Sequence, residues 1–175
     1  MELFTALHTR RSYRGMYRPD PVPREDLTKI MEAVLAAPSG CNMQTTSVIA
    51  LDDPELIATL GGMLHKPHFA SAPAALCILT EAKPAYRGRL YNVQDYAAAI
   101  ENALLAITAL GYESCWVEGY VTGEDRIGRQ MADILGVPKN MELVAYLPVG
   151  KPAEEGKRVE KLPFEERAWF NGYRK

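Results

Sequence analysis

Arg10-Arg11-Ser12-Tyr13-Arg14 and, about one helix later, Ala37-Pro38-Ser39-Gly40-Cys41-Asn42-Met43-Gln44 are the two stretches that decide how this chain is interpreted. The first stretch brings guanidinium groups and a hydroxyl close together, and these are the donors that a phosphate group needs. The second stretch is a turn that carries side-chain amides, which match the polar edges of a planar heterocycle. Together they predict a site for a ligand with a phosphate at one end and a heterocyclic ring at the other.

The overall composition is that of an ordinary globular protein. The chain has 175 residues, of which 47% are hydrophobic and 24% charged, so a single domain over residues 1–175 is expected. A formal net charge of -2 gives no basic excess for a nucleic-acid partner. Apolar runs are too short for a membrane span, and Arg10 and Arg11 follow the first apolar residues instead of preceding them, so we expect a cytoplasmic protein without a signal peptide. The cysteines and histidines lack the spacing of a disulfide framework or a metal site.

Helix and strand patterns alternate along the chain. Helices are expected at residues 1–7, 23–37, 54–62, 92–110 and 124–135, the last of them opened by a capping box at 122–125, and strands at 45–51, 72–80, 114–117 and 141–149. Such alternation ordinarily favours a parallel sheet. The helix at 92–110 is apolar around most of its circumference, which predicts that it is buried or forms a subunit interface. The charged tail at 151–175 carries spaced aromatics and is predicted to pack on its own domain or on a partner subunit.

Each motif taken alone has an ordinary explanation. A basic run such as the one at residues 10–14 is more often a solvated turn, and the same holds for Lys157, Arg158 and Lys161 in the tail. The dipeptide Glu118-Gly119 could simply end a strand. Cysteines 41 and 115 have no neighbouring cysteine and are expected to be packing residues. The order and spacing of the motifs carry more information than any one of them.

That order resembles the nitroreductase family of FMN-dependent oxidoreductases, and the resemblance runs over nearly the whole chain. The basic motif follows a first short helix, and a Pro-Ser-x-x-Asn-x-Gln turn follows the second. A long buried helix near Asp95, the Gly-containing turn at Glu118-Gly119 and the strand end Gly150-Lys151-Pro152 complete the pattern. The resemblance implies an α+β fold with a mostly antiparallel central sheet flanked by helices, in place of the parallel sheet that the alternation favours. It also implies a homodimer in which the C-terminal segment reaches onto the partner subunit.

The resemblance further implies which residues hold FMN at the dimer interface. The phosphate would be bound by the basic motif and the tail, the pyrimidine edge of the ring by Arg14, and the reactive ring nitrogen by the backbone at Glu118-Gly119. Pro38, Ser39 and Asn42 would come from the opposite subunit. In the tail, either Arg158 or Lys161 would make the last phosphate contact, with Arg158 favoured. The implied cofactor-binding residues are Arg10, Arg11, Ser12, Arg14, Pro38, Ser39, Asn42, Gln44, Glu118, Gly119, Arg158 and Lys161.

The function implied by the resemblance is transfer of hydride from NAD(P)H through the flavin to nitroaromatic, quinone or similar small-molecule acceptors by a ping-pong mechanism. No residue is expected to be catalytic in the strict sense, because the cofactor carries the reaction. The chain is short for the family, so an open pocket is expected, with Tyr86, Tyr91 or His68 near it. A flavin carrier or redox sensor without robust turnover is the alternative, and a flavin-free interaction domain is a third possibility. The sequence does not choose between NADH and NADPH.

Overall fold

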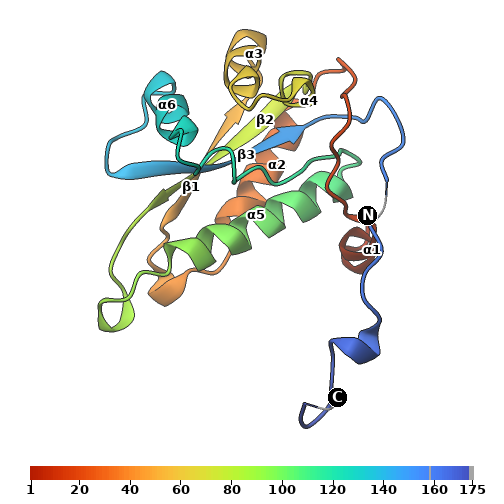
Figure 1. Cartoon of the computed structure of the whole chain (residues 1–175), viewed down its shortest axis with the longest axis vertical. Coiled ribbons are helices and arrows are strands. Elements are labelled where there is room, and N and C mark those ends of the chain that lie inside the picture. The colour runs from red at the N-terminus through yellow and green to blue at the C-terminus, as the bar shows by residue number, and fades with distance from the viewer. Residues whose placement is uncertain (158, 174–175) are drawn as a thin grey trace.

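The computed structural model describes residues 1–157 and 159–173, and these form a small antiparallel sheet with helices on both faces (Figure 1). The strands are β1 (Thr46–Leu51), β2 (Ala74–Glu81) and β3 (Met141–Val149). The helices are α1 (Leu3–Thr9), α2 (Arg24–Leu35), α3 (Pro54–Gly62), α4 (Pro67–Ala70), α5 (Asn92–Ala109) and α6 (Ile127–Ile134), and short 3-10 turns lie at Gly40–Asn42, Tyr86–Gly88 and Phe164–Glu166.

The sheet confirms the α+β fold that the family resemblance implies. Strand β2 lies between β1 and β3 and runs antiparallel to both, with Thr46 opposite Thr80 in one pair and Ala74 opposite Val149 in the other. A register shift between Ile78 and Leu79 marks an irregularity in the second pair. The parallel sheet favoured by alternation alone is therefore wrong, because α3 and α4 return the chain to the sheet as an antiparallel neighbour of β1.

The core has two halves, one on each face of the sheet. Side chains alternate along β2, so even-numbered residues from Ala74 to Ile78 pack with α2 and α5, and odd-numbered residues from Ala75 to Leu79 pack with α3, α4 and α6. Figure 1 shows α2 and α5 on one side of the strands and α3 and α6 on the other. Strand β2 is buried on both faces, which explains its nearly uniform apolar sequence.

Two expected elements differ from the structure. Residues 114–117 form no strand; isolated bridges join Ser12 to Ser114 and Val117 to Tyr146, so this segment pairs with two different parts of the chain. Helix α6 begins at Ile127, three residues later than expected, and the expected capping box is absent. The Thr122 hydroxyl donates to the Glu118 carbonyl instead, because residues 118–122 form a turn of their own. Helix α4 was not expected.

Across residues 1–157 and 159–173, no helix is both long and apolar enough to cross a membrane.

Candidate functional site

The basic motif lies in extended chain directly after α1. Tyr13 donates its backbone N–H to the Ser114 carbonyl at 2.8 Å, and its buried ring directs the hydroxyl to the Met16 carbonyl at 2.7 Å. Since successive side chains of an extended segment point to opposite sides, Ser12 and Arg14 face outward. They line a pocket of about 460 Å³, here called the basic pocket. Its lining residues are Leu7, His8, Arg10, Arg11, Ser12, Arg14, Lys157, Val159 and Lys161.

Some cations of the basic pocket pair with acidic side chains of the chain itself, and others are available to bind a ligand. The Arg10 Nε lies 3.0 Å from the Glu101 carboxylate. Arg11 donates to Glu113 at 3.0 Å and to the Gly156 carbonyl at 2.8 Å, so its side chain holds the tail against the body. For the part of the chain that the structure describes, Arg14, Lys157 and Lys161 have no acidic group within 4.0 Å. A phosphate would therefore meet several cations without having to displace an existing carboxylate.

Arg14 also lines a second pocket of about 300 Å³, here called the Trp116 pocket. Its walls are Phe69, Cys115, Trp116, Val117, Glu118, Gly119 and Tyr120. The indole N–H of Trp116 is buried without a hydrogen-bond partner among the described residues. Burial raises the pKa of the Cys115 thiol to about 11, so this cysteine stays neutral and behaves as a packing residue. The two pockets meet at Arg14 and together offer a cationic end and a largely apolar end.

The turn after Trp116 is held by the side chain and backbone of Glu118. Its carboxylate accepts a hydrogen bond from the Tyr96 hydroxyl at 2.9 Å, and its carbonyl accepts from the Val121 and Thr122 N–H groups at 2.8 Å. Burial and the neighbouring Glu118 carboxylate raise the pKa of Tyr96 to about 12, which keeps the phenol a proton donor at neutral pH. Gly119 is exposed, and a side chain there would meet nothing within 4 Å. Its backbone is therefore accessible to a ligand in the Trp116 pocket.

The second sequence motif forms a turn fixed by a buried carboxylate. Asp95, in the first turn of α5, accepts from the Gly40 N–H at 2.8 Å and from the Thr45 hydroxyl at 2.7 Å. The Ser39 hydroxyl oxygen accepts from the Gln44 N–H at 3.0 Å. The φ angles of Cys41, Asn42 and Gln44 are 51°, 54° and 48°, in the left-handed region that costs energy for residues other than glycine. This turn thus holds an unfavourable backbone shape through specific hydrogen bonds.

Within one chain the two motifs do not meet. Pro38, Ser39 and Gln44 line a third pocket, together with Asp95, and this pocket shares no lining residue with the basic pocket or the Trp116 pocket. Asn42 is exposed in the same turn. The separation is compatible with the expectation that this turn serves the site of a partner subunit.

Sequence reasoning missed part of the site. Lys157 lines the basic pocket although it was not among the expected binding residues, and Trp116 lines the second pocket. The clue available for Lys157 was its place in the basic run of the tail. Lys161 lines the basic pocket, and its phosphate contact stays a prediction. The expectation for Arg158 falls outside the described residues.

Comparisons with known proteins match this chain to one family. The family model described as "Nitroreductase family" matches residues 7–66 and 61–151. A protein of Archaeoglobus fulgidus provisionally named NADH dehydrogenase/NAD(P)H nitroreductase is 34% identical over 162 residues, which cover 88% of this chain and 87% of the relative. An FMN reductase [NAD(P)H] of Bacillus subtilis is 29% identical over 181 residues, covering 94% and 71% of the two chains.

Solved structures of other proteins show the same similarity of fold. An FMN-dependent nitroreductase of Clostridium difficile R20291 superposes with a TM-score of 0.79 at 26% identity, covering 97% of this chain and 99% of the other. A BluB-like flavoprotein of Clostridium difficile 630 shares the fold with a TM-score of 0.83 at 24% identity, covering 98% and 100%. The chain therefore belongs to the nitroreductase family.

Proposed function

We propose that this chain is an FMN-dependent oxidoreductase that passes hydride from NAD(P)H to nitroaromatic, quinone or similar acceptors by a ping-pong mechanism. The observation that carries the proposal is the position of Arg14, which lines both the basic pocket and the Trp116 pocket. A ligand with a phosphate at one end and a flat ring at the other would fill both pockets. Relatives of this chain are named NAD(P)H nitroreductase and FMN reductase, which agrees with such a ligand.

The residues of the basic pocket fit the phosphate of FMN. Arg10, Ser12 and Lys161 offer guanidinium, hydroxyl and ammonium donors around one hollow, and Lys157 adds a further cation. Arg11 acts indirectly, because its bonds to Glu113 and the Gly156 carbonyl bring the tail to the pocket.

The residues of the Trp116 pocket fit the ring. When bound, FMN supplies reversible two-electron chemistry between the nicotinamide and the acceptor. Arg14 would place a cation beside the ring, where it would stabilise negative charge. Phe69 and Trp116 exclude water from one side, and the exposed Gly119 backbone offers an N–H donor. The Tyr96–Glu118 hydrogen bond keeps this donor in place.

We further propose that two copies of residues 1–175, each a single FMN-binding domain, form a homodimer with the flavin at the interface. The tail extends away from the sheet in Figure 1. Its residues Phe164 and Phe170 are 64% and 79% exposed. Phe4 of α1 is 73% exposed, and α1 and the tail line the basic pocket together. Aromatic surface of this kind is typical of a protein interface. Pro38, Ser39, Asn42 and Gln44 would then reach the partner's flavin.

We propose that the acceptor side of the site is open, because Gly119 and Tyr120 in the wall of the Trp116 pocket are exposed. Tyr86 and Tyr91 lie on a short loop and do not line the Trp116 pocket. Tyr91 packs against Gly40 in the turn of the second motif, and the Tyr86 ring is 57% exposed beneath the Arg87 guanidinium. His68 packs on Phe69 at 4.1 Å between ring centroids, and burial, followed by the charges of Lys66 and Arg14, lowers the pKa of His68. An open pocket with a neutral imidazole nearby suits flat aromatic acceptors of varied shape.

The test is the visible spectrum of the purified protein, followed by anaerobic addition of NADH or NADPH and then of a quinone or nitroaromatic compound. We expect a yellow protein that bleaches and then regains its colour. Arg14→Gln should weaken FMN binding by about tenfold to a hundredfold, the equivalent of about 1.5–3 kcal/mol for a charge-assisted contact. Arg18→Gln is the control, because Arg18 is exposed and lines neither pocket.

Two outcomes would contradict the proposal. A yellow protein that neither nucleotide bleaches would favour a flavin carrier or redox sensor. A colourless protein that also fails to take up added FMN would favour an interaction domain in which the arginines form a surface patch.

A further inference from the structure

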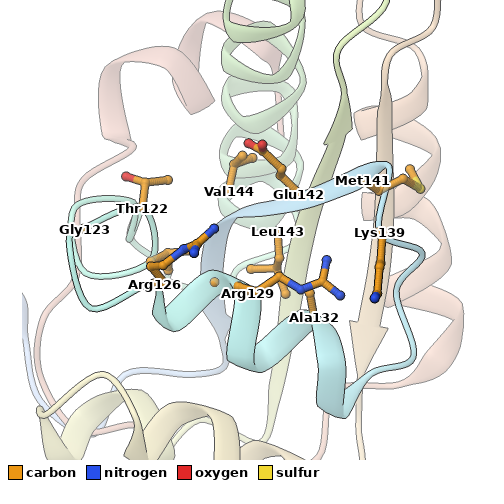
Figure 2. Close-up of a pocket in the computed structure, with 12 residues that line it drawn as sticks. Thr122, Gly123, Arg126, Arg129, Ala132, Lys139, Met141, Glu142, Leu143 and Val144 are labelled. Carbon is orange, nitrogen blue, oxygen red and sulfur yellow. The ribbon is translucent and has the colours of Figure 1, made fainter.

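A second cationic pocket lies between α6 and β3 and belongs to neither half of the site described above (Figure 2). Its volume is about 290 Å³, and we call it the α6 pocket. Figure 2 shows Arg126 and Arg129 extending from the α6 side and Lys139 from the loop before β3, around the same hollow. The floor is apolar and includes Leu143 of β3.

The charge of the α6 pocket is not balanced by its own side chains. Arg129 pairs with Asp133 one helical turn further on. Arg126 and Lys139 have no carboxylate within 4.0 Å in the described ranges 1–157 and 159–173. Glu142 is the acidic residue of the lining, and Figure 2 shows its carboxylate pointing away from the cations. Two exposed cations therefore remain available to an anion.

An arginine is also energetically unfavourable at residue 126, at the N-terminal end of α6. It is the N-cap residue of α6 with φ 53° and ψ 37°, a left-handed conformation, and it makes no side-chain capping bond. Asp, Asn, Ser and Thr are the usual N-cap residues, and a cation at this end opposes the helix dipole. A bound anion would remove the charge conflict, because it would meet both the guanidinium and the helix N-terminus.

Only one turn separates the α6 pocket from the Trp116 pocket. Residues 118–120 line the Trp116 pocket, and residues 121–123 line the α6 pocket. The turn is compact, because the Val121 and Thr122 N–H groups both donate to the Glu118 carbonyl. A side chain at Gly123 would come within 3.0 Å of the Gly119 carbonyl. A long ligand that lies at the mouth of the Trp116 pocket could therefore continue over this turn to the cations.

We propose that the α6 pocket binds the 2′-phosphate of NADPH while the nicotinamide lies against the flavin ring held in the Trp116 pocket. This proposal rests on the proposed function. The 2′-phosphate is the group that NADH lacks, and an arginine near the ribose is a common way to accommodate it. The pocket would thus make the protein prefer NADPH over NADH.

The first experiment compares flavin reduction by the two nucleotides in the holoprotein. In the double variant R126Q/K139Q, kcat/KM for NADPH should fall at least tenfold, while the value for NADH changes less than twofold. The preference should also weaken with added salt, because the contacts are exposed. Arg18→Gln is the matched control, since it removes an exposed cation outside the α6 pocket. An unchanged NADPH-to-NADH ratio in the double variant would overturn the proposal.

The second experiment does not depend on turnover. The holoprotein is titrated calorimetrically with adenosine 2′,5′-bisphosphate, adenosine 5′-monophosphate and inorganic phosphate. Tighter binding of the bisphosphate, lost in R126Q/K139Q, supports the α6 pocket even if neither nucleotide reduces the flavin, in which case the proposed function alone fails. Equal binding of the bisphosphate and the monophosphate, or inorganic phosphate binding as tightly as the bisphosphate, would overturn the assignment to NADPH.

Discussion

Replacing Asp95 tests whether one buried carboxylate shapes the Ser39–Gln44 turn. Asp95 is 4% exposed, and its carboxylate accepts hydrogen bonds from the Gly40 N–H and the Thr45 hydroxyl at 2.8 Å and 2.7 Å. Asp95→Ala would leave both donors without an acceptor, at about 1–3 kcal/mol each. The free energy of unfolding should therefore fall by about 2–5 kcal/mol, allowing for partial access of water. For a domain of this size the loss corresponds to a Tm lower by roughly 4–20 °C.

Asp95→Asn separates the hydrogen bonds from the charge. An asparagine can accept from the Gly40 N–H and donate to the Thr45 hydroxyl oxygen, so about 1–2 kcal/mol should be lost. Urea unfolding, followed by tryptophan fluorescence, measures both variants. If the turn also serves a partner's flavin, Asp95→Ala should release FMN at urea concentrations that do not unfold the chain. The reasoning is refuted if Asp95→Ala unfolds at the same urea concentration as the unchanged protein.

Three further predictions concern other parts of the molecule. The free energy of unfolding should fall between pH 10 and pH 12, because folding raises the pKa of Tyr96 to about 12 and the folded protein then keeps a proton that the unfolded chain has released. Urea titration at each pH measures this fall, which should be less steep in Tyr96→Phe. Gly128→Ala should lower the free energy of unfolding by about 1–3 kcal/mol, because the added methyl would clash with the Leu143 carbonyl. The control is Gly62→Ala, whose added methyl meets nothing within 4 Å, and it should change the Tm of a thermal melt little. Lys161→Ala should weaken FMN binding about fivefold in a fluorescence titration. Riboflavin binding should stay unchanged, since riboflavin has no phosphate. Equal losses for both flavins would contradict a phosphate contact.

Local sequence signals predicted most of the helices. The helix α3 begins as expected at Asp53-Pro54, where the aspartate side chain accepts from the N–H groups of Glu55 and Leu56 at 2.8 Å and 3.1 Å. The length of α5 followed from its apolar pattern. Strand direction did not follow from the pattern, because alternating helices and strands are compatible with either direction, and the family resemblance supplied it.

The errors lie where long-range contacts decide the local structure. Ser114 pairs with Ser12, about one hundred residues earlier in the chain, and Val117 with Tyr146, so the segment between them cannot form a continuous ladder. Thr122 had a capping-box sequence, but the Glu118 turn engages its hydroxyl. Periodicity and capping rules describe neighbours in sequence and carry no information about such partners.

The candidate site was predictable to the extent that its residues are neighbours in sequence. Arg10, Ser12 and Arg14 alternate along one extended segment, so their common pocket could be expected. Lys157 and Trp116 reach the site through tertiary contacts and could not be identified in the same way. The α6 pocket combines a loop, a helix start and a strand, and no single motif of the sequence indicated it.

The basic pocket is built from segments far apart in the sequence, since one wall comes from residues 7–14 and the other from Lys157, Val159 and Lys161. During synthesis, the N-terminal wall leaves the ribosome long before the other exists. Under the proposed function, a nascent chain therefore could not hold the phosphate end of FMN until Lys157 and Lys161 have left the ribosome and Arg11 has bonded to the Gly156 carbonyl. Under the proposed function, cofactor loading would thus wait for the tail to pack onto the N-terminal wall, and a protease that cuts after Gly156 would release the phosphate end of the ligand before it damages the core.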